Sequence, residues 1–472
     1  PSRMANFDEL LNRYDELSRN LMNSMKDGKK FIVVTHIDAD GLCSGAMTFV
    51  ALARRGATVS GRTVPDLDPK TIEVLREERY DFYIFTDLGS TLVSELAVAL
   101  DNRFLVLDHH ELPEVSERNP AVVNAWQYGY DGGTEACSST MAYYFARALD
   151  YSNRDLAYLS VVGALADRQD VGEGRSLTGL NGKALEEAQS SGLLTVSKDL
   201  LFYGRETRPL HEAIASSSSP FIKGLSGSKD AALAALIKAG IRMKESAKWR
   251  TLAELSSEEK KKVTEVVASF LAPAGGGGAE VIGALIGDIY TLGMEDAFTP
   301  LRDAREFATL LNSCGRMGKP GLGLSICVGD RSDSLREGMR LLSEYRAEIN
   351  KSVQGILSDS GRVEIREDFA FVTGDDLVDE KLLGPVTSIL ASAPQFKDRV
   401  IVARTKSGDS ELKISSRVGD SHNREVNLGV MMREAAEKMG GVGGGHMMAA
   451  GAKIPLSRGP DFAKTVLERA GV

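Results

Sequence analysis

The chain has 472 residues, of which 43% are hydrophobic and 26% are charged, and its formal net charge at pH 7 is −9. This length exceeds what one hydrophobic core usually supports, so we expect two or three domains, and the composition excludes a wholly disordered protein. The acidic balance argues against a surface coated with positive charge for sequence-blind binding of duplex DNA, although metal ions and a local basic groove can still hold phosphates.

Targeting signals and cysteines give two further expectations. The apolar runs are shorter than the roughly 18 to 20 residues that a membrane span needs, and the N-terminus lacks the pattern of a signal peptide. We therefore expect a cytoplasmic protein that does not contact membranes. The four cysteines, Cys43, Cys137, Cys314 and Cys327, are far apart and form no paired CxxC spacing, which favours reduced, mostly buried thiols.

The first predicted element is an amphipathic helix over residues 7–25, where apolar residues recur at helical spacing. From residue 30 onward, short apolar runs alternate with helical segments. We predict strands at 31–35, 57–64, 82–86 and 104–107, and helices at 42–54, 69–78 and 91–100. This alternation is typical of an α/β fold in which helices cover a parallel sheet.

The middle of the chain has a different character. Residues 136–201 are predicted to be helical, with an apolar helix at 156–166, and the following stretch to residue 271 is mostly helical and polar. The serine run 216–219 and the glycine run 275–278 indicate loops or hinges.

Further along, the patterns predict a helix at 301–307 and a strand at 324–328. A long, charged amphipathic helix is predicted at 333–357, which would suit a spacer between two lobes. A second α/β unit is expected to begin near residue 363. The expected domains are a catalytic domain at 5–199, a mostly helical connector with an insertion at 200–355, and a smaller α/β substrate-binding domain at 356–472, with a cleft between the lobes.

Carboxylates and histidines gather where three of the predicted strands end. The clusters are His36, Asp38 and Asp40 after the first strand, Asp87 after the third, and Asp108, His109 and His110 after the fourth. Because ligands bind at the carboxyl edge of a parallel sheet, these side chains are expected to meet there. One aspartate after a strand is often only a helix cap, but capping does not easily explain three such clusters. Imidazole with carboxylate suits Mn²⁺, with Mg²⁺, Zn²⁺ or Co²⁺ as substitutes.

These motifs resemble those of the DHH superfamily of phosphoesterases, whose signature is the Asp108-His109-His110 triplet. His36-x-Asp38-x-Asp40-Gly41 resembles its first motif, Asp87 its second, and Ala166-Asp167-Arg168 its fourth. The resemblance covers roughly residues 30–190 and 360–472. The length and the form of the first motif are most similar to the archaeal RecJ-like exonucleases.

The C-terminal part resembles the DHHA1 domain that accompanies the nuclease branch of this superfamily. The resemblance rests on Ser415-Ser416-Arg417 and on Gly443-Gly444-Gly445-His446, which continues to Ala449-Ala450-Gly451. It implies a substrate clamp made of Ser415, Arg417, Gly443, Gly444, Gly445 and His446. Exposed glycine N–H groups can hold phosphates, and arginine can contact a phosphate through two hydrogen bonds.

The resemblance also implies a site for two divalent metal ions, with Mn²⁺ preferred and Mg²⁺ as the alternative. Asp87 would bridge the two ions, and the other ligands would be Asp38, Asp40, His109 and Asp167. Two cations about 3.5–4 Å apart can deprotonate a shared water and stabilise the leaving oxygen of a phosphodiester. For His36, a direct metal contact and a role without metal both remain open.

The remaining residues of the site have less direct roles. His110 is expected to face the substrate, and Asp108 to orient an imidazole through its ring N–H.

Two polar segments, residues 205–211 and 312–316, have two interpretations that stay open. They are either parts of a salt-bridge network between domains or, through residues such as Arg316, the lining of a nucleic-acid channel.

The leading hypothesis is a metal-dependent exonuclease that acts on single-stranded DNA or RNA and takes part in DNA replication or repair. One alternative is a replication accessory or scaffold protein that binds the GINS complex, because the eukaryotic replicative helicase contains a degenerate member of the superfamily. Another alternative is a phosphodiesterase of short oligonucleotides or small phosphates. The relatives of that last kind are usually shorter, which would leave residues 200–355 unexplained.

Overall fold

The computed structural model describes residues 5–112, 119–217, 222–271, 283, 285–393, 395–419, 422, 426–445 and 447–470. The predicted glycine run, His446 and the second half of the predicted serine run lie outside these residues. The chain divides into two compact units. Unit 1 consists of Pro1–Ile214 with Asp230–Leu342, and unit 2 of Ala215–Lys229 with Ser343–Val472.

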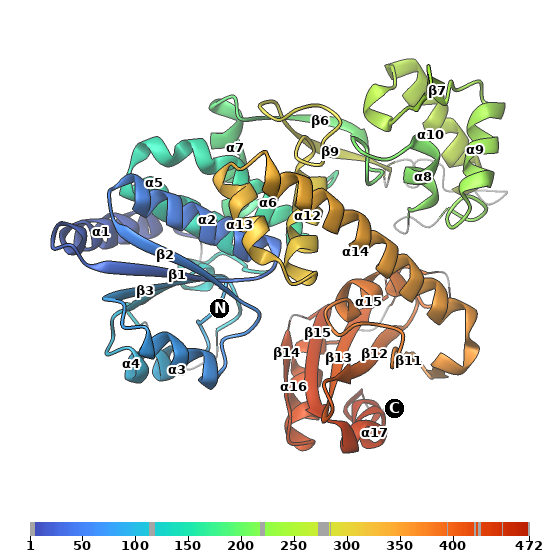
Figure 1. Cartoon of the computed structure of the whole chain (residues 1–472). Coiled ribbons are helices and arrows are strands. Elements are labelled where there is room, and N and C mark those ends of the chain that lie inside the picture. The colour runs from blue at the N-terminus through green and yellow to red at the C-terminus, as the bar shows by residue number, and fades with distance from the viewer. Residues whose placement is uncertain are drawn as a thin grey trace. The chain divides into compact units, whose positions relative to one another are not determined.

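Unit 1 contains a parallel five-stranded sheet with the strand order β2-β1-β3-β4-β5 (Figure 1). Its strands are β1 (Lys30–His36), β2 (Thr58–Val64), β3 (Phe82–Thr86), β4 (Phe104–Asp108) and β5 (Val122–Asn124). The four predicted strands agree with β1 to β4 within one residue at each end. The expected α/β architecture is thereby confirmed.

Helices cover both faces of this sheet, as Figure 1 shows. The helices of unit 1 that come before β6 in the chain are α1 (Phe7–Lys26), α2 (Ala39–Arg54), α3 (Pro69–Glu77), α4 (Val93–Ala99), α5 (Ser138–Leu149), α6 (Ala157–Ala166) and α7 (Gly179–Ser190). Phe31 and Val33 of β1 pack in one core with α2 and α5, whereas Ile32 and Val34 pack in a second core with α3 and α4. Burial on both faces explains why the strands are nearly continuous apolar runs in the sequence.

Two predictions for the middle of the chain are wrong. Residues 194–200 were expected to be helical but form β6 (Leu194–Leu200), which pairs antiparallel with β9 (Ile286–Leu292). The pairing partner lies far away along the chain, so the local pattern did not reveal it. Residues 324–328 were expected to be a strand but belong to α13 (Pro320–Val328). Pro320 in the first turn and the left-handed Gly329 after the last one are ordinary helix ends, and a short apolar run alone does not distinguish a strand from a buried helix.

Between β6 and β9 the chain forms a small, largely helical region. Its elements are α8 (Leu210–Ala215), α9 (Lys229–Lys238), β7 (Lys244–Glu245), β8 (Lys248–Trp249) and α10 (Ser257–Leu271). After β9 come α12 (Ala304–Arg316), α13 and α14 (Asp333–Ser358). The predicted helix at 301–307 starts later than expected, because the Asp303 side chain caps α12 by accepting hydrogen bonds from the Arg305 and Glu306 amides.

Unit 2 contains a mixed six-stranded sheet with the order β10-β11-β12-β13-β15-β14. The strands are β10 (Val363–Arg366), β11 (Phe369–Thr373), β12 (Val400–Ser407), β13 (Glu411–Val418), β14 (Val442–Gly445) and β15 (Ala449–Pro455). Its helices are α15 (Leu383–Ala391), α16 (Leu428–Lys438) and α17 (Gly459–Ala470). The first strand of this sheet starts at Val363, whereas unit 2 also includes the preceding residues from Ser343.

Two smaller expectations concern the thiols and the membrane. All four cysteines are buried free thiols. Among the described residues, every helix is too short or too polar to cross a membrane.

Candidate metal centre

The carboxyl ends of β1, β3 and β4 bring the predicted ligands together. Asp38 follows β1 and caps α2, where its side chain accepts a hydrogen bond of 3.0 Å from the Gly41 amide. A Cβ atom at Gly41 would lie 2.5 Å from the carbonyl oxygen of His36, so only glycine fits this tight turn. Asp87 follows β3 with a left-handed backbone at φ 64°. Such a conformation is uncommon outside glycine, and it is frequent at functional sites.

Asp87 lies between two groups of candidate ligands. One carboxylate oxygen of Asp87 is 3.5 Å from Nδ1 of His36, which is itself 2.9 Å from the Asp38 carboxylate. The other oxygen is 3.4 Å from Nε2 of His109, which is 3.3 Å from the Asp167 carboxylate. His36, Asp38 and Asp87 thus form one group that could hold a cation.

A second group with metal-binding capacity consists of Asp40, His109 and Asp167. Asp40 is fully buried, and each of its carboxylate oxygens accepts a hydrogen bond of 2.8 Å from the amides of Ser138 and Ser139. These two amides begin α5, whose positive N-terminal end favours a carboxylate. The hydrogen bonds fix the orientation of Asp40 and leave further lone pairs on both oxygens for a cation.

The electrostatics of the cluster indicate a shortage of positive charge. Burial and the nearby Asp87 raise the pKa of Asp40 to about 6. Burial and the charge of Asp40 also raise the pKa of Asp167 well above its usual range. The pKa of His109 is raised too, because the surrounding carboxylates outweigh its burial. Divalent cations bound to these carboxylates would relieve the repulsion that raises their pKa values. The oxygen and imidazole donors fit Mn²⁺ or Mg²⁺.

A buried network sets the orientation of the His109 ring. The carbonyl oxygen of Gly132 is 2.5 Å from Nδ1 of His109, so that nitrogen carries the proton and Nε2 faces Asp87 and Asp167. The Gln169 side chain donates to the same carbonyl at 2.8 Å and accepts a hydrogen bond of 2.6 Å from Asn181. Gln169 and Asn181 are each 1% exposed. A carbonyl partner of this kind fixes the tautomer of a metal-binding histidine.

Asp108 has a similar effect on His110. One Asp108 oxygen accepts a hydrogen bond of 2.7 Å from Nδ1 of His110 and one of 2.8 Å from the His109 amide. Although burial acts in the opposite direction, Asp108 raises the pKa of His110 to about 9. The His110 side chain is 44% exposed.

Helix α12 contacts the loop of residues 36–39 between β1 and α2, which carries candidate ligands and is called the metal-binding loop below. The Asn312 side chain accepts a hydrogen bond of 2.9 Å from the Ala39 amide, and a Cβ atom at Gly315 would lie 1.9 Å from the Ile37 carbonyl oxygen. Arg316, the last residue of α12, is half-buried and has neither a hydrogen bond nor an ion pair of its side chain among the described residues. The predicted polar segment 312–316 therefore borders the metal-binding loop.

The other polar segment, residues 205–211, includes one member of a salt-bridge network. The Arg205 guanidinium is 2.7 Å from the Asp199 carboxylate, which also accepts from the Lys260 ammonium at 2.5 Å. The Glu206 amide donates to Glu306 at 2.7 Å. These contacts join the helical region between β6 and β9 to the body of unit 1.

The predicted clamp residues lie in unit 2. Strand pairing places Ser415 of β13 beside Gly451 of β15, and Gly451 beside Gly444 of β14. Arg417 lies two residues after Ser415, and its guanidinium donates to Ser388 at 3.0 Å and to the Ser416 carbonyl at 2.7 Å. These residues form a row of small side chains next to one arginine. His446 lies outside the described residues.

The three glycines of β14 are not equivalent. A Cβ atom at Gly443 would lie 2.4 Å from the Met432 carbonyl oxygen, and one at Gly445 would lie 2.6 Å from the Ala449 carbonyl oxygen. At Gly444 the space for a Cβ atom is open. Packing therefore explains Gly443 and Gly445, but not Gly444.

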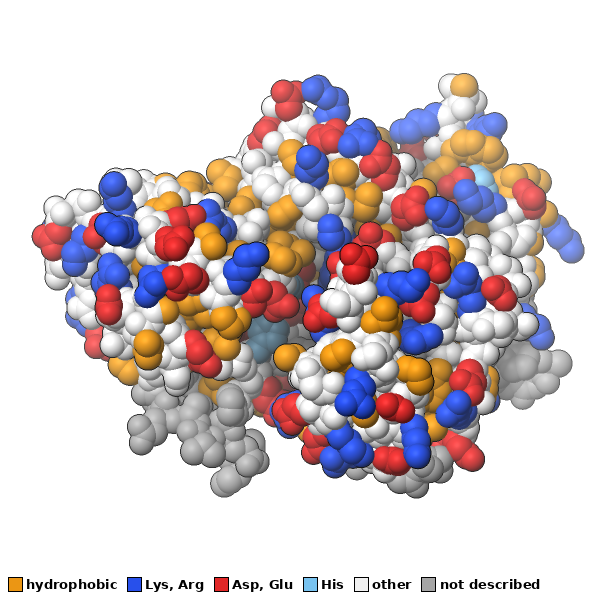
Figure 2. All heavy atoms as spheres, turned by 60° about the horizontal axis from the view of Figure 1, so that its bottom comes forward, with side chains coloured by type: hydrophobic (Ala, Val, Ile, Leu, Met, Phe, Trp, Pro, Cys, Tyr) orange, Lys and Arg blue, Asp and Glu red, His pale blue; other side chains and the backbone are white. Residues whose placement is uncertain are grey.

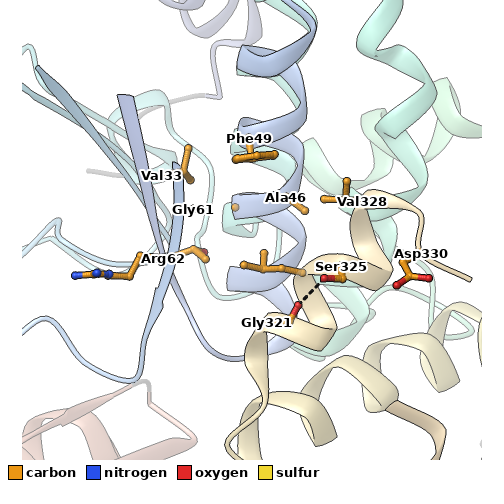
Figure 3. A pocket seen from close by; sticks show the side chains of 12 residues that line it. Val33, Ala46, Phe49, Gly61, Arg62, Gly321, Ser325, Val328 and Asp330 are labelled. Atoms are coloured by element: carbon orange, nitrogen blue, oxygen red, sulfur yellow. Dashed lines mark hydrogen bonds between the residues drawn. The ribbon is translucent and has the colours of Figure 1, made fainter. Parts of the chain in front are cut away.

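Unit 1 also has a hollow of about 470 Å³ away from the metal centre (Figure 3). Val33, Ala46, Phe49 and Val328 give it a mostly apolar lining, and β1, β2, α2 and α13 surround it. This lining suits packing or an uncharged ligand rather than a metal ion. Figure 2 shows acidic and basic side chains interspersed over the face in view.

Sequence reasoning missed the residues that position the ligands. Gln169, Asn181 and Ser139 support His109 and Asp40, and Asn312 supports the metal-binding loop. They are ordinary polar residues in helices or loops, and they meet the ligands only in three dimensions. The one local signal was the run of polar residues after Asp167 at the end of an apolar helix.

Three family models match the chain and together account for most of it. They describe the DHH family N-terminal domain over residues 30–164, the DHH-CID domain over residues 202–284 and the DHHA1 domain over residues 368–471. The chain therefore contains a DHH-family N-terminal domain, a DHH-CID domain and a C-terminal DHHA1 domain. Its fold is that of the DHH family and is RecJ-like.

Particular relatives show how far this likeness extends. An uncharacterized protein of Methanocaldococcus jannaschii is 28% identical over 447 residues, which are 93% of each chain. RecJ from Thermus thermophilus in complex with Mn²⁺ is 18% identical with a TM-score of 0.61; the match covers 100% of this chain and 56% of that one. CDC45 from Entamoeba histolytica is 13% identical with a TM-score of 0.66, and the match covers 97% of this chain and 98% of that one. These two structures share the fold of this chain, which spans little more than half of the length of Thermus RecJ.

Proposed function

We propose that the protein is an exonuclease that hydrolyses the phosphodiester bonds of single-stranded DNA or RNA with the help of two divalent metal ions, Mn²⁺ in preference to Mg²⁺. The observation that carries this proposal is the position of Asp87, whose two carboxylate oxygens face two separate groups of candidate ligands. A carboxylate between two cation sites is the arrangement that a two-metal hydrolase needs.

In this proposal each residue has a defined role. Asp38 and His36 would hold one ion, Asp40, His109 and Asp167 would hold the other, and Asp87 would contribute to both. His36 is included because its Nδ1 faces both Asp38 and Asp87. When bound, two such metal ions would supply an activated water and stabilise the charge that develops on the phosphate.

His110 would act on the substrate side of the centre. Its Nδ1–H is held by Asp108, so Nε2 can donate a proton to a phosphate oxygen or to the departing alkoxide. Asp108 positions His110 and does not itself contact the substrate.

The remaining proposed contacts would bind the nucleic-acid strand. Arg417 would pair with a phosphate, Ser415 and the glycines of β14 would allow the backbone of the strand to approach closely, and His446 would complete this clamp. Arg316 would contribute a further positive charge from α12. We propose the domain limits 5–199, 200–355 and 356–472 for the catalytic, connecting and clamp regions.

The test is digestion of single-stranded DNA and RNA oligonucleotides labelled at either the 5′ or the 3′ end, with Mn²⁺ present or removed by a chelator. We expect Mn²⁺-dependent release of nucleotides from one end, and the labelling shows which end. The Asp87→Asn variant should lose this activity. A matched control is Asp101→Asn, because Asp101 is an exposed aspartate with a similar left-handed backbone at φ 52° before β4, at the opposite edge of the sheet. Release by the Asp87→Asn variant at the rate of the control would refute the proposal.

The likeness to CDC45 favours a second candidate, a replication accessory protein that binds the GINS complex. It extends over nearly the whole of both chains, including the helical region between β6 and β9. The presence of a full set of metal-binding side chains argues against a purely structural role, but both roles can coexist. Co-purification of GINS with the Asp87→Asn variant would establish binding that is separate from catalysis.

A third candidate is a phosphodiesterase of short oligonucleotides or small phosphates. Comparison of turnover on long single strands, dinucleotides and pyrophosphate separates it from the exonuclease. A clear preference for the long strands is expected.

A further inference from the structure

Arg168 occupies a position that normally calls for glycine. It follows Asp167 at the end of α6 and has a left-handed backbone with φ 58°. The Arg168 amide donates to the Leu165 carbonyl at 3.2 Å, and the Gln169 amide donates to the Ala164 carbonyl at 3.0 Å. This pair of hydrogen bonds is the Schellman helix ending, in which glycine or asparagine usually takes the left-handed position. Arginine adopts this conformation only with backbone strain.

The Arg168 side chain makes no contact that would stabilise the fold among the described residues. It is exposed, and it has no hydrogen bond or ion pair in the part of the chain that the structure describes. Arg175, which has a similar backbone at φ 62°, is different because its guanidinium is 3.0 Å from the buried Asp170 carboxylate. A strained residue without a structural partner is a candidate for a functional role.

The position of Arg168 suggests what that role is. Its Cα atom is about 3.8 Å from that of Asp167, as for any two residues joined by a trans peptide bond. The Asp167 carboxylate is 3.3 Å from Nε2 of His109 in the candidate metal centre. Arg168 is therefore an exposed, unpaired positive charge next to that centre. The carboxylates of the centre repel any phosphate that the metal ions do not bind directly, and a guanidinium beside them offsets this repulsion.

We propose that Arg168 binds a phosphate next to the one that is cleaved, so that the metal centre favours strands with consecutive phosphates over isolated diesters. The inference rests on the proposed function, because it requires a phosphodiester at the metal centre. It assigns substrate selection to a residue of unit 1, in addition to the clamp proposed in unit 2.

The experiment compares Arg168→Gly with a matched control, Arg79→Gly. Arg79 is also an exposed arginine with a left-handed backbone, φ 55°, and without a side-chain partner among the described residues, but it precedes β3 and lies at the opposite edge of the sheet. Both substitutions relieve the same kind of backbone strain, so neither should lower the Tm. Fluorescence anisotropy measures the binding of a labelled single-stranded oligonucleotide at several salt concentrations, and calorimetry measures the binding of Mn²⁺.

We expect Arg168→Gly to weaken oligonucleotide binding about tenfold and to reduce the slope of log K against log salt by about 0.7, the value for one phosphate contact on a single strand. Its kcat/KM should fall at least fivefold more on the oligonucleotide than on bis(4-nitrophenyl) phosphate, which has a single phosphate. Arg168→Lys should keep the salt slope, because it keeps the charge. Arg79→Gly should match the wild type in every measurement.

The possible results separate this inference from the proposed function. A wild-type salt slope and affinity in Arg168→Gly would overturn the inference and leave the exonuclease proposal untouched. Weaker Mn²⁺ binding in Arg168→Gly, with equal losses on both substrates, would also overturn it, because Arg168 would then act through Asp167. If the wild type cleaves neither substrate, the proposed function fails, and the salt dependence of binding still decides whether Arg168 contacts a phosphate.

Discussion

The candidate metal centre of unit 1 and the β13–β15–β14 surface of unit 2 are built by opposite means. The metal centre gathers charged side chains at the ends of parallel strands and fixes them with buried hydrogen bonds, such as those from Ser138 and Ser139 to Asp40. In unit 2 the paired residues Ser415, Gly451 and Gly444 form a row of backbone and small side chains, and Arg417 follows Ser415 on the same strand. A cluster of carboxylates needs bound cations to act on a phosphate, whereas a glycine-rich strand needs open space for a substrate to approach its backbone. Damage to the first should therefore reduce the rate of catalysis, and damage to the second should reduce the affinity for the substrate.

The largest effect is expected from Asp167→Asn. Loss of one ligand charge should lower kcat with Mn²⁺ by about 10³-fold, since a metal ion contributes several kcal/mol to the stabilisation of the transition state. In the absence of metal the same variant should have a higher Tm than the wild type. The raised pKa of Asp167 means that its ionised form costs stability, so this difference should grow as the pH rises through that pKa. Tm measurements from pH 5 to 8 test this, and a variant less stable than the wild type throughout would contradict it.

A smaller effect is expected when a supporting residue of the same centre is changed. Gln169→Ala removes the side chain that holds the Gly132 carbonyl, so the affinity for Mn²⁺ should fall about 10- to 100-fold. Saturating Mn²⁺ should restore most of kcat, because the ligands themselves remain. Gln189→Ala, on the exposed side of α7, is the control. If excess Mn²⁺ does not restore activity, Gln169 has a role beyond positioning.

The smallest effect is expected in unit 2 and depends on which glycine is changed. Gly444→Ala has room for its methyl group, so the Tm should stay the same while the affinity for single-stranded oligonucleotides falls a few-fold. Gly443→Ala should instead destabilise the fold by about 1–3 kcal/mol, because the methyl group would press against the Met432 carbonyl. Thermal unfolding and fluorescence anisotropy of both variants give the result. Unchanged affinity in Gly444→Ala would show that the substrate does not approach this strand.

The sequence predicted the sheet of unit 1 well and the arrangement around the metal centre less completely. The strands were recognisable because both faces of the sheet are covered, which produces apolar runs such as residues 31–35. The candidate ligands could be proposed from the sequence because most of them follow those strands directly. The pairing of β6 with β9 and the contacts of Gln169 and Asn312 depend on segments that are distant in the chain, and a single sequence contains no signal for them. The apolar run at 324–328 was misread because the identity of a short apolar segment depends on what packs against it.

The pairing of β6 with β9 also bears on how the helical region between them could have been acquired. The Leu201 amide donates to the Leu285 carbonyl at 2.9 Å, so the two ends of the intervening segment lie side by side. The DHH-CID domain, residues 202–284, fills the interval between them. A segment whose ends meet can be gained, lost or exchanged without moving the rest of a fold, since closing a longer loop costs little additional entropy. The paired strands thus mark an insertion point, where evolution or a protein engineer could replace the intervening domain while the metal-binding loop stays in place.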